Sequence, residues 1–140
     1  MDKIKLAITG CMGRMGQKLI KTAKRDKSIR LVSLTESRLI NRKVSGIIPE
    51  LNTEKALNKA DVVIDFTSPE CTFEVLKIAS KLKKRVIIGT TGFSKKEEKL
   101  IEKYSKIIPI LKAGNMSLGI NLLMYLTEIT SSSLGNNYLS

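Results

Sequence analysis

Short apolar runs alternate along this chain with longer segments in which apolar residues recur at helical spacing. Five of these runs have the length and composition of strands that helices bury on both faces. They are Ile4–Thr9, Ile29–Thr35, Val62–Asp65, Val86–Ile88 and Ile107–Leu111. Strands that alternate with helices in this way form parallel crossover units. The pattern therefore predicts an α/β fold in which helices cover both faces of a parallel sheet.

The segments between these runs predict helices with clear boundaries. The first helix is expected from about Arg14 to Lys24. A second follows Ser68-Pro69-Glu70, where an N-cap, a proline at the first helical position and an early acid come in order. Its expected apolar face consists of Val75, Leu76, Ala79 and Leu82.

A third helix is expected to begin at Ser94, because Glu97 three residues later completes a capping box. The side chains expected to face inward from it are Leu100, Ile101 and Tyr104. The segment Leu39–Ala60 is less regular, and we expect it to form a loop with one short helix.

Three glycines follow the first predicted strand in Gly10-Cys-Met-Gly-Arg-Met-Gly16. A dinucleotide pyrophosphate requires a strand, a glycine turn and a helix start in this order. The first glycine allows the turn, the second lets the backbone approach the phosphates, and the third lets the helix pack closely. Free N–H groups and the positive dipole end of the helix then face the anion. The pattern predicts a Rossmann-like site, and a glycine-rich turn that binds nothing is the alternative.

An acidic residue stands where such a site needs one. Glu36 directly follows the second predicted strand, 20 residues beyond Gly16, and a carboxylate at about this distance binds the ribose in dinucleotide folds.

Loops after the last three predicted strands combine small residues with hydroxyl or amide side chains. They read Asp65-Phe66-Thr67-Ser68-Pro69, Gly89-Thr90-Thr91-Gly92-Phe93 and Ala113-Gly114-Asn115-Met116-Ser117. In an open α/β sheet, ligands bind beyond the carboxyl ends of the strands. Each loop alone is also typical of a turn or a helix cap. Three such loops at one edge favour a binding site for a flat cofactor.

Composition narrows the class of protein. A chain of 140 residues with 42% hydrophobic and 27% charged residues fits one globular domain. Its apolar runs are shorter than a membrane span, and Ile4–Thr9, interrupted by Lys5, is too short for a signal peptide. Two cysteines imply no disulfide framework, and the lack of histidine argues against a zinc site. We expect a cytoplasmic protein with neither a membrane partner nor a metal.

The formal net charge of +12 raises the question of nucleic-acid binding. Lysines account for most of the 25 basic residues, and they are spread over almost every predicted element. The three phenylalanines and three tyrosines do not alternate with basic residues as stacking platforms do. A lysine-rich solvated surface that helps to capture anionic ligands is therefore preferred to a nucleic-acid interface.

The composition changes after Lys112, because residues 113–140 contain no lysine or arginine and a single acid. An apolar helical stripe in this part consists of Leu122, Leu123, Leu126 and Ile129. We expect a dinucleotide-binding domain over residues 1–115. Residues 116–140 are expected to form a connecting helix and the start of a second domain, the rest of which lies outside this sequence.

Four motifs occur together in order: Gly-x-x-Gly-Arg-Met-Gly at 10–16, Ile-Asp-Phe-Thr-x-Pro-Glu at 64–70, Gly-Thr-Thr-Gly-Phe at 89–93 and Gly-Asn-Met-Ser-Leu-Gly at 114–119. Because of these four motifs, the chain resembles the N-terminal half of bacterial 4-hydroxy-tetrahydrodipicolinate reductases, also called dihydrodipicolinate reductases. The resemblance extends over essentially the whole chain. The resemblance implies an NADH- or NADPH-dependent oxidoreductase of diaminopimelate and lysine biosynthesis. Such an enzyme transfers hydride to a cyclic dipicolinate precursor, and the full-length family is tetrameric.

The resemblance also assigns cofactor-binding roles to residues of this chain. Those that would hold the pyrophosphate, with the arginine towards the adenosine side, are Gly10, Cys11, Met12, Gly13, Arg14 and Met15. Glu36 would accept the ribose hydroxyls, and Phe66 would pack near the cofactor. The residues that would meet the nicotinamide end are Gly89, Thr90, Thr91, Gly114, Asn115, Met116 and Ser117.

Two departures from the family pattern leave questions open. Ser37 stands where many members that accept a 2′-phosphate have arginine, and Arg38 comes one residue later, so the choice between NADH and NADPH stays open. The family's His-His-x-x-x-Lys segment, which binds and protonates the product, has no counterpart in residues 1–140. The resemblance places that segment beyond Ser140, so no catalytic residue is predicted within this sequence.

Two alternatives to this reductase remain at this point. One is a stand-alone or truncated nucleotide-binding module without reductase activity. The other, among enzymes, is an aspartate or semialdehyde dehydrogenase. The Gly-Thr-Thr-Gly-Phe and Gly-Asn-Met-Ser motifs argue against a dehydrogenase of that kind.

Overall fold

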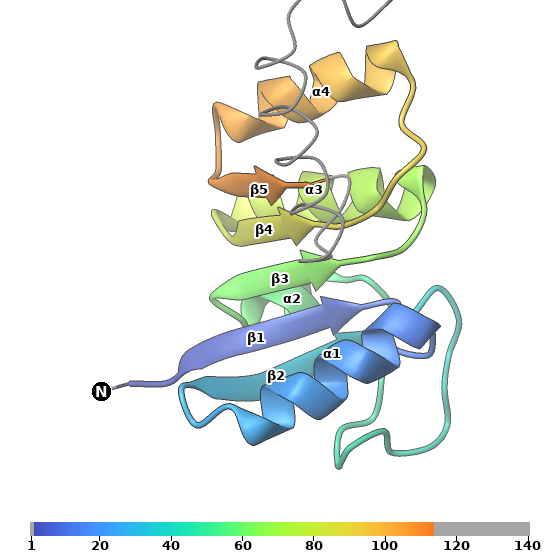
Figure 1. The fold of residues 1–140 in the computed structure, drawn as a ribbon, viewed down its shortest axis with the longest axis vertical. Coiled ribbons are helices and arrows are strands. Elements are labelled where there is room, and N and C mark those ends of the chain that lie inside the picture. Colours follow the sequence, from blue (N-terminus) through green and yellow to red (C-terminus); the bar gives the residue numbers. More distant parts are fainter. Residues whose placement is uncertain (1, 114–140) are drawn as a thin grey trace, which may run out of the picture.

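The computed structural model describes residues 2–113, in which five parallel strands form one sheet (Figure 1). They are β1 (Ile4–Thr9), β2 (Ile29–Thr35), β3 (Val62–Asp65), β4 (Arg85–Ile88) and β5 (Ile110–Lys112). Their spatial order is β2-β1-β3-β4-β5, so the chain first moves outward from β1 to β2 and then crosses to the other side of β1. The order reverses between β1 and β3, which is where ligands bind in open α/β sheets. The predicted parallel α/β fold is confirmed.

Four helices lie between the strands in residues 2–113, and two of them begin at the N-caps that the sequence predicts. They are α1 (Arg14–Arg25), α2 (Glu54–Asn58), α3 (Pro69–Leu82) and α4 (Lys95–Ser105). The Ser68 side chain accepts a hydrogen bond from the Cys71 N–H at the start of α3. At the start of α4, Ser94 and Glu97 form both hydrogen bonds of the predicted capping box. The short helix expected within the irregular segment 39–60 is α2, and Thr53 caps it. None of the helices in residues 2–113 has the length and apolar character needed to cross a bilayer.

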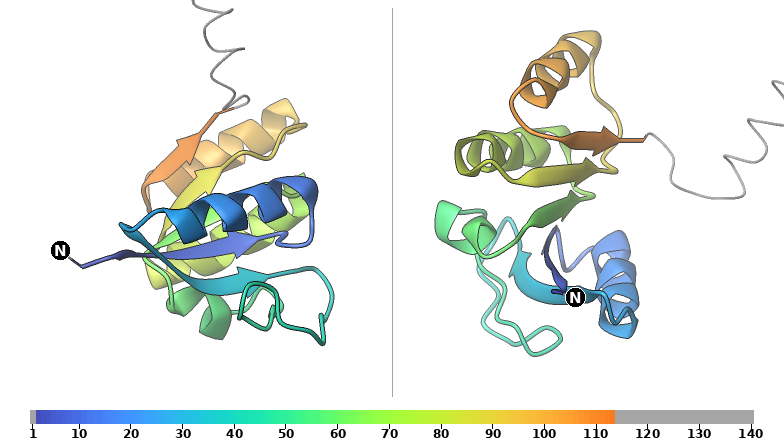
Figure 2. Two further views of the ribbon diagram at one scale, coloured as in Figure 1. Left: turned by 60° about the horizontal axis from the view of Figure 1, so that its bottom comes forward. Right: turned by 90° about the vertical axis from the view of Figure 1, so that its left-hand side faces the viewer.

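Two apolar layers lie on opposite faces of the sheet, because successive side chains of a strand point to opposite faces. In β1, Leu6 and Ile8 face α1, whereas Ala7 faces α2 and α3. The right-hand view of Figure 2 shows α1 on one side of the sheet and α2 and α3 on the other. The buried residues of the α1 layer are Leu6, Ile8, Cys11, Ile20, Ala23 and Leu34. Those of the opposite layer are Ala7, Leu57, Ala60, Val63, Val75, Leu76, Ala79, Val86, Ile88, Ile101 and Ile108.

The last strand starts three residues later than predicted. The N–H groups of Ile107 and Ile108 donate to the carbonyl oxygen of Tyr104, at 2.9 and 3.1 Å, and so complete the exit from α4. Pro109 has no N–H group to offer the sheet, and β5 therefore begins at Ile110. Ile108 still packs in the core with 2% of its surface exposed.

One side chain expected to face inward from α4 does not do so. Leu100 is 40% exposed, whereas the neighbouring Ile101 is buried. Successive residues of a helix are rotated by about 100°, and the stripe of α4 that reaches the core is narrow. Leu100 lies beside that stripe. Tyr104 and the α3 residue Leu82 are partly buried against the core, as expected.

The predictions for the last part of the sequence lie outside the described residues. They are the connecting helix expected over residues 116–140, with its apolar stripe from Leu122 to Ile129, and the expected start of a second domain. Ser140, beyond which the family's His-His-x-x-x-Lys segment is expected, belongs to the same part. The domain boundary at 115/116 and the absence of a catalytic residue before Ser140 therefore stay predictions.

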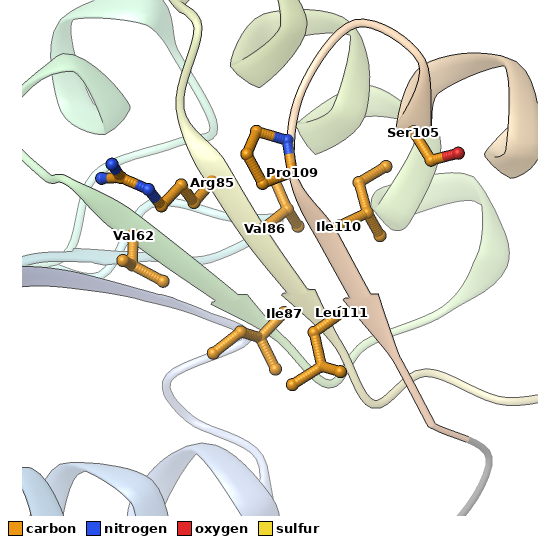
Figure 3. Close-up of a pocket in the computed structure, with 8 residues that line it drawn as sticks. All are labelled: Val62, Arg85, Val86, Ile87, Ser105, Pro109, Ile110 and Leu111. Carbon is orange, nitrogen blue, oxygen red and sulfur yellow. The ribbon is translucent and has the colours of Figure 1, made fainter.

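The face of the sheet that carries α1 is only partly covered by the described residues. α1 packs on β1 and β2, and farther along this face Leu111 of β5 is 61% exposed. A shallow depression there is lined by Val62, Arg85, Val86, Ile87, Ser105, Pro109, Ile110 and Leu111. Figure 3 shows Ile87 and Leu111 side by side on neighbouring strands. None of the predicted cofactor residues within the described range lines this depression.

Candidate functional site

The predicted cofactor residues within the described range gather at one edge of the sheet. In the register of the strands, Thr9 pairs with Thr35 on one side and with Asp65 on the other, and Asp65 pairs with Ile88. The four strands therefore end level with one another. The residues that follow them are Gly10, Glu36, Phe66 and Gly89. Gly114, Asn115, Met116 and Ser117 lie outside the described residues.

The turn after β1 has the shape that the glycines predict. Gly10 has a φ of +63°, a conformation that glycine adopts without strain. The N–H group of Gly13 donates to the Gly10 carbonyl oxygen at 3.0 Å, and α1 begins directly afterwards. Among the described residues, no side chain caps this helix start, and its first turn contains no acid. N–H groups at the start of α1 are thus free to bind an anion.

Gly16, the third glycine, lets α1 pack closely against the turn, and Gly13, the second, leaves room for the phosphates to approach the main chain. A Cβ on Gly16 would overlap the carbonyl oxygen of Gly10 and lie 2.9 Å from the Cα of Cys11, so α1 can approach the turn only with glycine here. Gly13 is exposed, has a φ of −72°, and would place a Cβ 3.3 Å from the Gly10 oxygen. A side chain at Gly13 therefore requires only a small shift of the Gly10 carbonyl group, but it would occupy the surface that the phosphates need.

Glu36 lies against this turn although 24 residues separate it from Met12. Its Oε2 atom accepts a hydrogen bond from the Met12 N–H at 3.0 Å, and its Oε1 atom accepts one from the Ser37 N–H at 3.0 Å. The Ser37 hydroxyl also donates to Oε1, at 3.4 Å. A carboxylate has about four positions for accepting hydrogen bonds, so one remains for a ribose hydroxyl, and a second becomes available if that hydroxyl displaces the long bond from Ser37. The contact with Met12 brings the acid that follows β2 to the glycine turn, and its role in binding the ribose stays a prediction.

Cys11 can offer the site only its main chain. The side chain is fully buried in the α1 layer. Burial, together with the negative charge of Glu36, raises the pKa of the Cys11 thiol to about 11. The thiol is therefore neutral and packs as a small apolar group.

The loops after β3 and β4 are tied to one another. The Thr67 N–H donates to Oγ1 of Thr90 at 2.9 Å. A Cβ on Gly89 would overlap the ring of Phe66, so the two loops touch through this glycine. The hydroxyl of Thr90 is used within this contact, and only 3% of the residue is exposed. Of the predicted residues Gly89, Thr90 and Thr91, only Thr91 has an exposed side chain to offer.

Asp65 is the residue whose importance sequence reasoning missed. It belongs to the Ile-Asp-Phe-Thr motif, but we expected no role for it. In the structure it is fully buried, and its carboxyl group accepts hydrogen bonds from four threonine hydroxyls. The sequence did contain one indication of this role, because Asp65 is an acidic residue at the end of an otherwise apolar strand.

Comparison with known proteins decides the family. A family model described as "Dihydrodipicolinate reductase, N-terminus" matches residues 4–116. The chain belongs to the dihydrodipicolinate reductase family. This confirms the resemblance that the four motifs carry.

Curated members of the family are similar along most or all of the chain. The 4-hydroxy-tetrahydrodipicolinate reductase of Pelagibacter ubique is 66% identical over 140 residues, which is 100% of this chain and 54% of that relative. The protein of the same name from Buchnera aphidicola subsp. Schizaphis graminum is 43% identical over 145 residues, covering 94% of this chain and 52% of the relative. The chain thus spans about half the length of the curated relatives it matches.

A solved structure supports the fold. The dipicolinate-bound dihydrodipicolinate reductase from Paenisporosarcina sp. TG-14 aligns with a TM-score of 0.72 at 24% identity. The alignment covers 91% of this chain and 53% of that one. The Rossmann-like fold inferred from the sequence is therefore confirmed.

Proposed function

We propose that this chain is the cofactor-binding part of an NAD(P)H-dependent 4-hydroxy-tetrahydrodipicolinate reductase. The observation that carries the proposal is the hydrogen bond of 3.0 Å from the Met12 N–H to Glu36. It joins the turn suited to a pyrophosphate to the acid suited to a ribose, at the point where the strand order reverses. The names of the relatives supply the substrate, a cyclic dipicolinate precursor. From the resemblance to the family comes the rest of the proposal, that the whole enzyme acts in lysine and diaminopimelate biosynthesis as a cytoplasmic tetramer.

In this part of the enzyme, the residues bind and orient the cofactor. Main-chain N–H groups of Arg14 and Met15 would hold the pyrophosphate, since both lie in the uncapped first turn of α1. Glu36 would fix the adenosine ribose through its free lone pairs. The loops around Phe66 and Gly89 would bound the nicotinamide end. When bound, the reduced nicotinamide supplies the hydride, and its chemistry belongs to the cofactor.

The residues around Glu36 favour NADH over NADPH. A 2′-phosphate would meet the carboxylate of Glu36, and Ser37 carries no positive charge to offset the repulsion. Arg38 is exposed and one residue farther along, so it reduces the preference without reversing it. We expect NADH to bind a few-fold more tightly than NADPH, which calorimetric titration with both cofactors measures. Tighter binding of NADPH by more than tenfold would contradict this assignment.

Calorimetric titration of NADH into the wild type and Gly13→Val tests the site. Valine at this position would project into the surface reserved for the phosphates, and we expect the affinity to fall at least tenfold, as for a lost anion site. Thr22→Val is the matched control, because it places the same side chain on an exposed position of α1, two turns away from the glycine turn. Equal affinities of Gly13→Val and the wild type would refute the proposed site.

A further inference from the structure

A buried carboxyl group lies at the centre of the edge that carries the candidate site. Asp65 ends β3, the middle strand of the sheet, and is fully buried. Its Oδ1 atom accepts hydrogen bonds from the hydroxyls of Thr9 at 2.7 Å and Thr67 at 2.6 Å. Its Oδ2 atom accepts from Thr72 and, at 3.3 Å, from Thr90. The ion pairs found within residues 2–113 do not include Asp65.

Four donors match the capacity of this group. A carboxyl group buried away from water is tolerated when its lone pairs are satisfied, and an ionised one has about four positions to fill. Each hydroxyl that donates its hydrogen to Asp65 has its rotation fixed. Oγ1 of Thr90 therefore presents a lone pair to the N–H group of Thr67, with which it forms the 2.9 Å hydrogen bond. Asp65 thus determines how the β3 and β4 loops meet.

The donors come from separate parts of the chain. Thr9 ends β1, Thr67 lies in the loop after β3, Thr72 lies in the first turn of α3, and Thr90 lies in the loop after β4. Two of them, Thr67 and Thr90, belong to the loops that carry Phe66 and Gly89. Because the ring of Phe66 fills the space above Gly89, a shift of either loop moves the other.

The glycine turn touches the same cluster, because Thr9 precedes it and a Cβ on Gly10 would lie 2.6 Å from Cγ2 of Thr67, but it is also held by contacts of its own. Met12 is bonded to Glu36, and Gly13 to Gly10. In addition, the side-chain amide of Gln17 donates to the Cys11 carbonyl oxygen at 2.6 Å. Loosening the bonds to Asp65 is therefore expected to displace the loops after β3 and β4 more than the turn after β1.

We propose that Asp65 is a positioning residue, which holds the β3 and β4 loops in the arrangement that receives the nicotinamide half of the cofactor without touching the cofactor itself. The proposal rests on the proposed function, since it takes this edge as the dinucleotide site. It predicts that binding of the two halves of the cofactor responds differently to the loss of a hydroxyl donor.

Thr72 offers the sharpest test, because it is buried on α3 and acts on the loops through Asp65. Thr72→Val keeps the shape of the side chain and removes the donor, whereas Thr72→Ser keeps the donor and removes a methyl group. The probes are NADH and ADP, and ADP reaches only the glycine turn and the adenosine ribose. For Thr72→Val we expect the Kd of NADH to rise about fivefold or more and that of ADP to change less than twofold. Thr72→Ser should bind both as the wild type does, even where its thermal stability is lower.

A parallel loss of ADP and NADH affinity in Thr72→Val, or an unchanged NADH affinity, would overturn the role of Asp65. Asp65→Asn, which keeps the size of the side chain but replaces one acceptor oxygen with an amide group, should give the same difference between NADH and ADP, and it decides the question if Thr72→Val does not fold. A wild-type chain that binds neither ADP nor NADH would instead refute the proposed function, and this inference with it.

Discussion

Replacing Gly16 with alanine is expected to destabilise the fold, against the usual trend for a glycine in a helix. Such a replacement ordinarily stabilises a protein by about 1 kcal/mol, because alanine favours the helix and restricts the unfolded chain. At Gly16, however, the new Cβ would overlap the Gly10 carbonyl oxygen and lie 2.9 Å from the Cα of Cys11. Both neighbours are main-chain atoms, so α1 itself has to move away from the turn.

The size of the effect follows from the contacts that would be lost. Overpacking of this kind costs about 1–3 kcal/mol. Movement of α1 also weakens the hydrogen bonds from Gln17 to Cys11 and from Met12 to Glu36, at about 1 kcal/mol each. After subtraction of the usual gain of about 1 kcal/mol for alanine, we expect a net loss of about 2–4 kcal/mol.

Gly13→Ala is the matched comparison. The new methyl group would lie 3.3 Å from its nearest neighbour, at an ordinary φ of −72°, so we expect a change of less than about 1 kcal/mol. Urea denaturation followed by circular dichroism gives the free energy of unfolding of both variants and the wild type. A Gly16→Ala variant at least as stable as the wild type would show that α1 does not approach the turn so closely.

Two further predictions concern a buried thiol and the exit from α4. Because the pKa of Cys11 is raised to about 11, about one thiol in a thousand is ionised at pH 8, and mass spectrometry should show alkylation in urea but almost none in the folded protein. Because the thiol ionises near pH 9 in the unfolded chain and near pH 11 in the folded one, the wild type should lose stability as the pH rises from 9 to 11, and Cys11→Ala should lose less over that range. Ile108→Ala should lower the free energy of unfolding by about 2–4 kcal/mol, and Ile107→Ala, at a position 51% exposed, by less than about 1 kcal/mol. Similar losses in the two variants would mean that the strand begins at Ile107 after all.

Features determined by neighbouring residues were predictable from the sequence. The bounds of β1, β2 and β3 agree with the structure, because each strand is an apolar run that a glycine or a polar residue ends. The place of Glu36 at the same edge of the sheet as the glycine turn follows from the strand pattern, since parallel strands of similar length end level with one another, whereas its hydrogen bond to Met12 is seen only in the structure. The start of β5 did not follow, because the final hydrogen bonds of α4 decide it rather than the apolar run from Ile107.

The role of Asp65 could not be read from the sequence for a different reason. Its four hydrogen-bond donors are spread between Thr9 and Thr90, and only the folded sheet brings them around one carboxyl group. The orientation of Thr90 is a consequence of the same cluster. A motif of small and hydroxyl residues at a strand end indicates a site, but it does not tell which hydroxyls face the ligand and which face the protein.

Mapping of amide chemical shifts during titration of the labelled chain with NADH tests the central claim most directly, since it locates the bound dinucleotide residue by residue. Binding at the carboxyl edge of the sheet predicts the largest changes at the amides of Met12, Ser37 and Thr91. The amides of Arg85 and Leu111, which border the depression on the α1 face, should stay unchanged. Changes confined to those two residues and their neighbours, with none at Met12 or Ser37, would contradict the account.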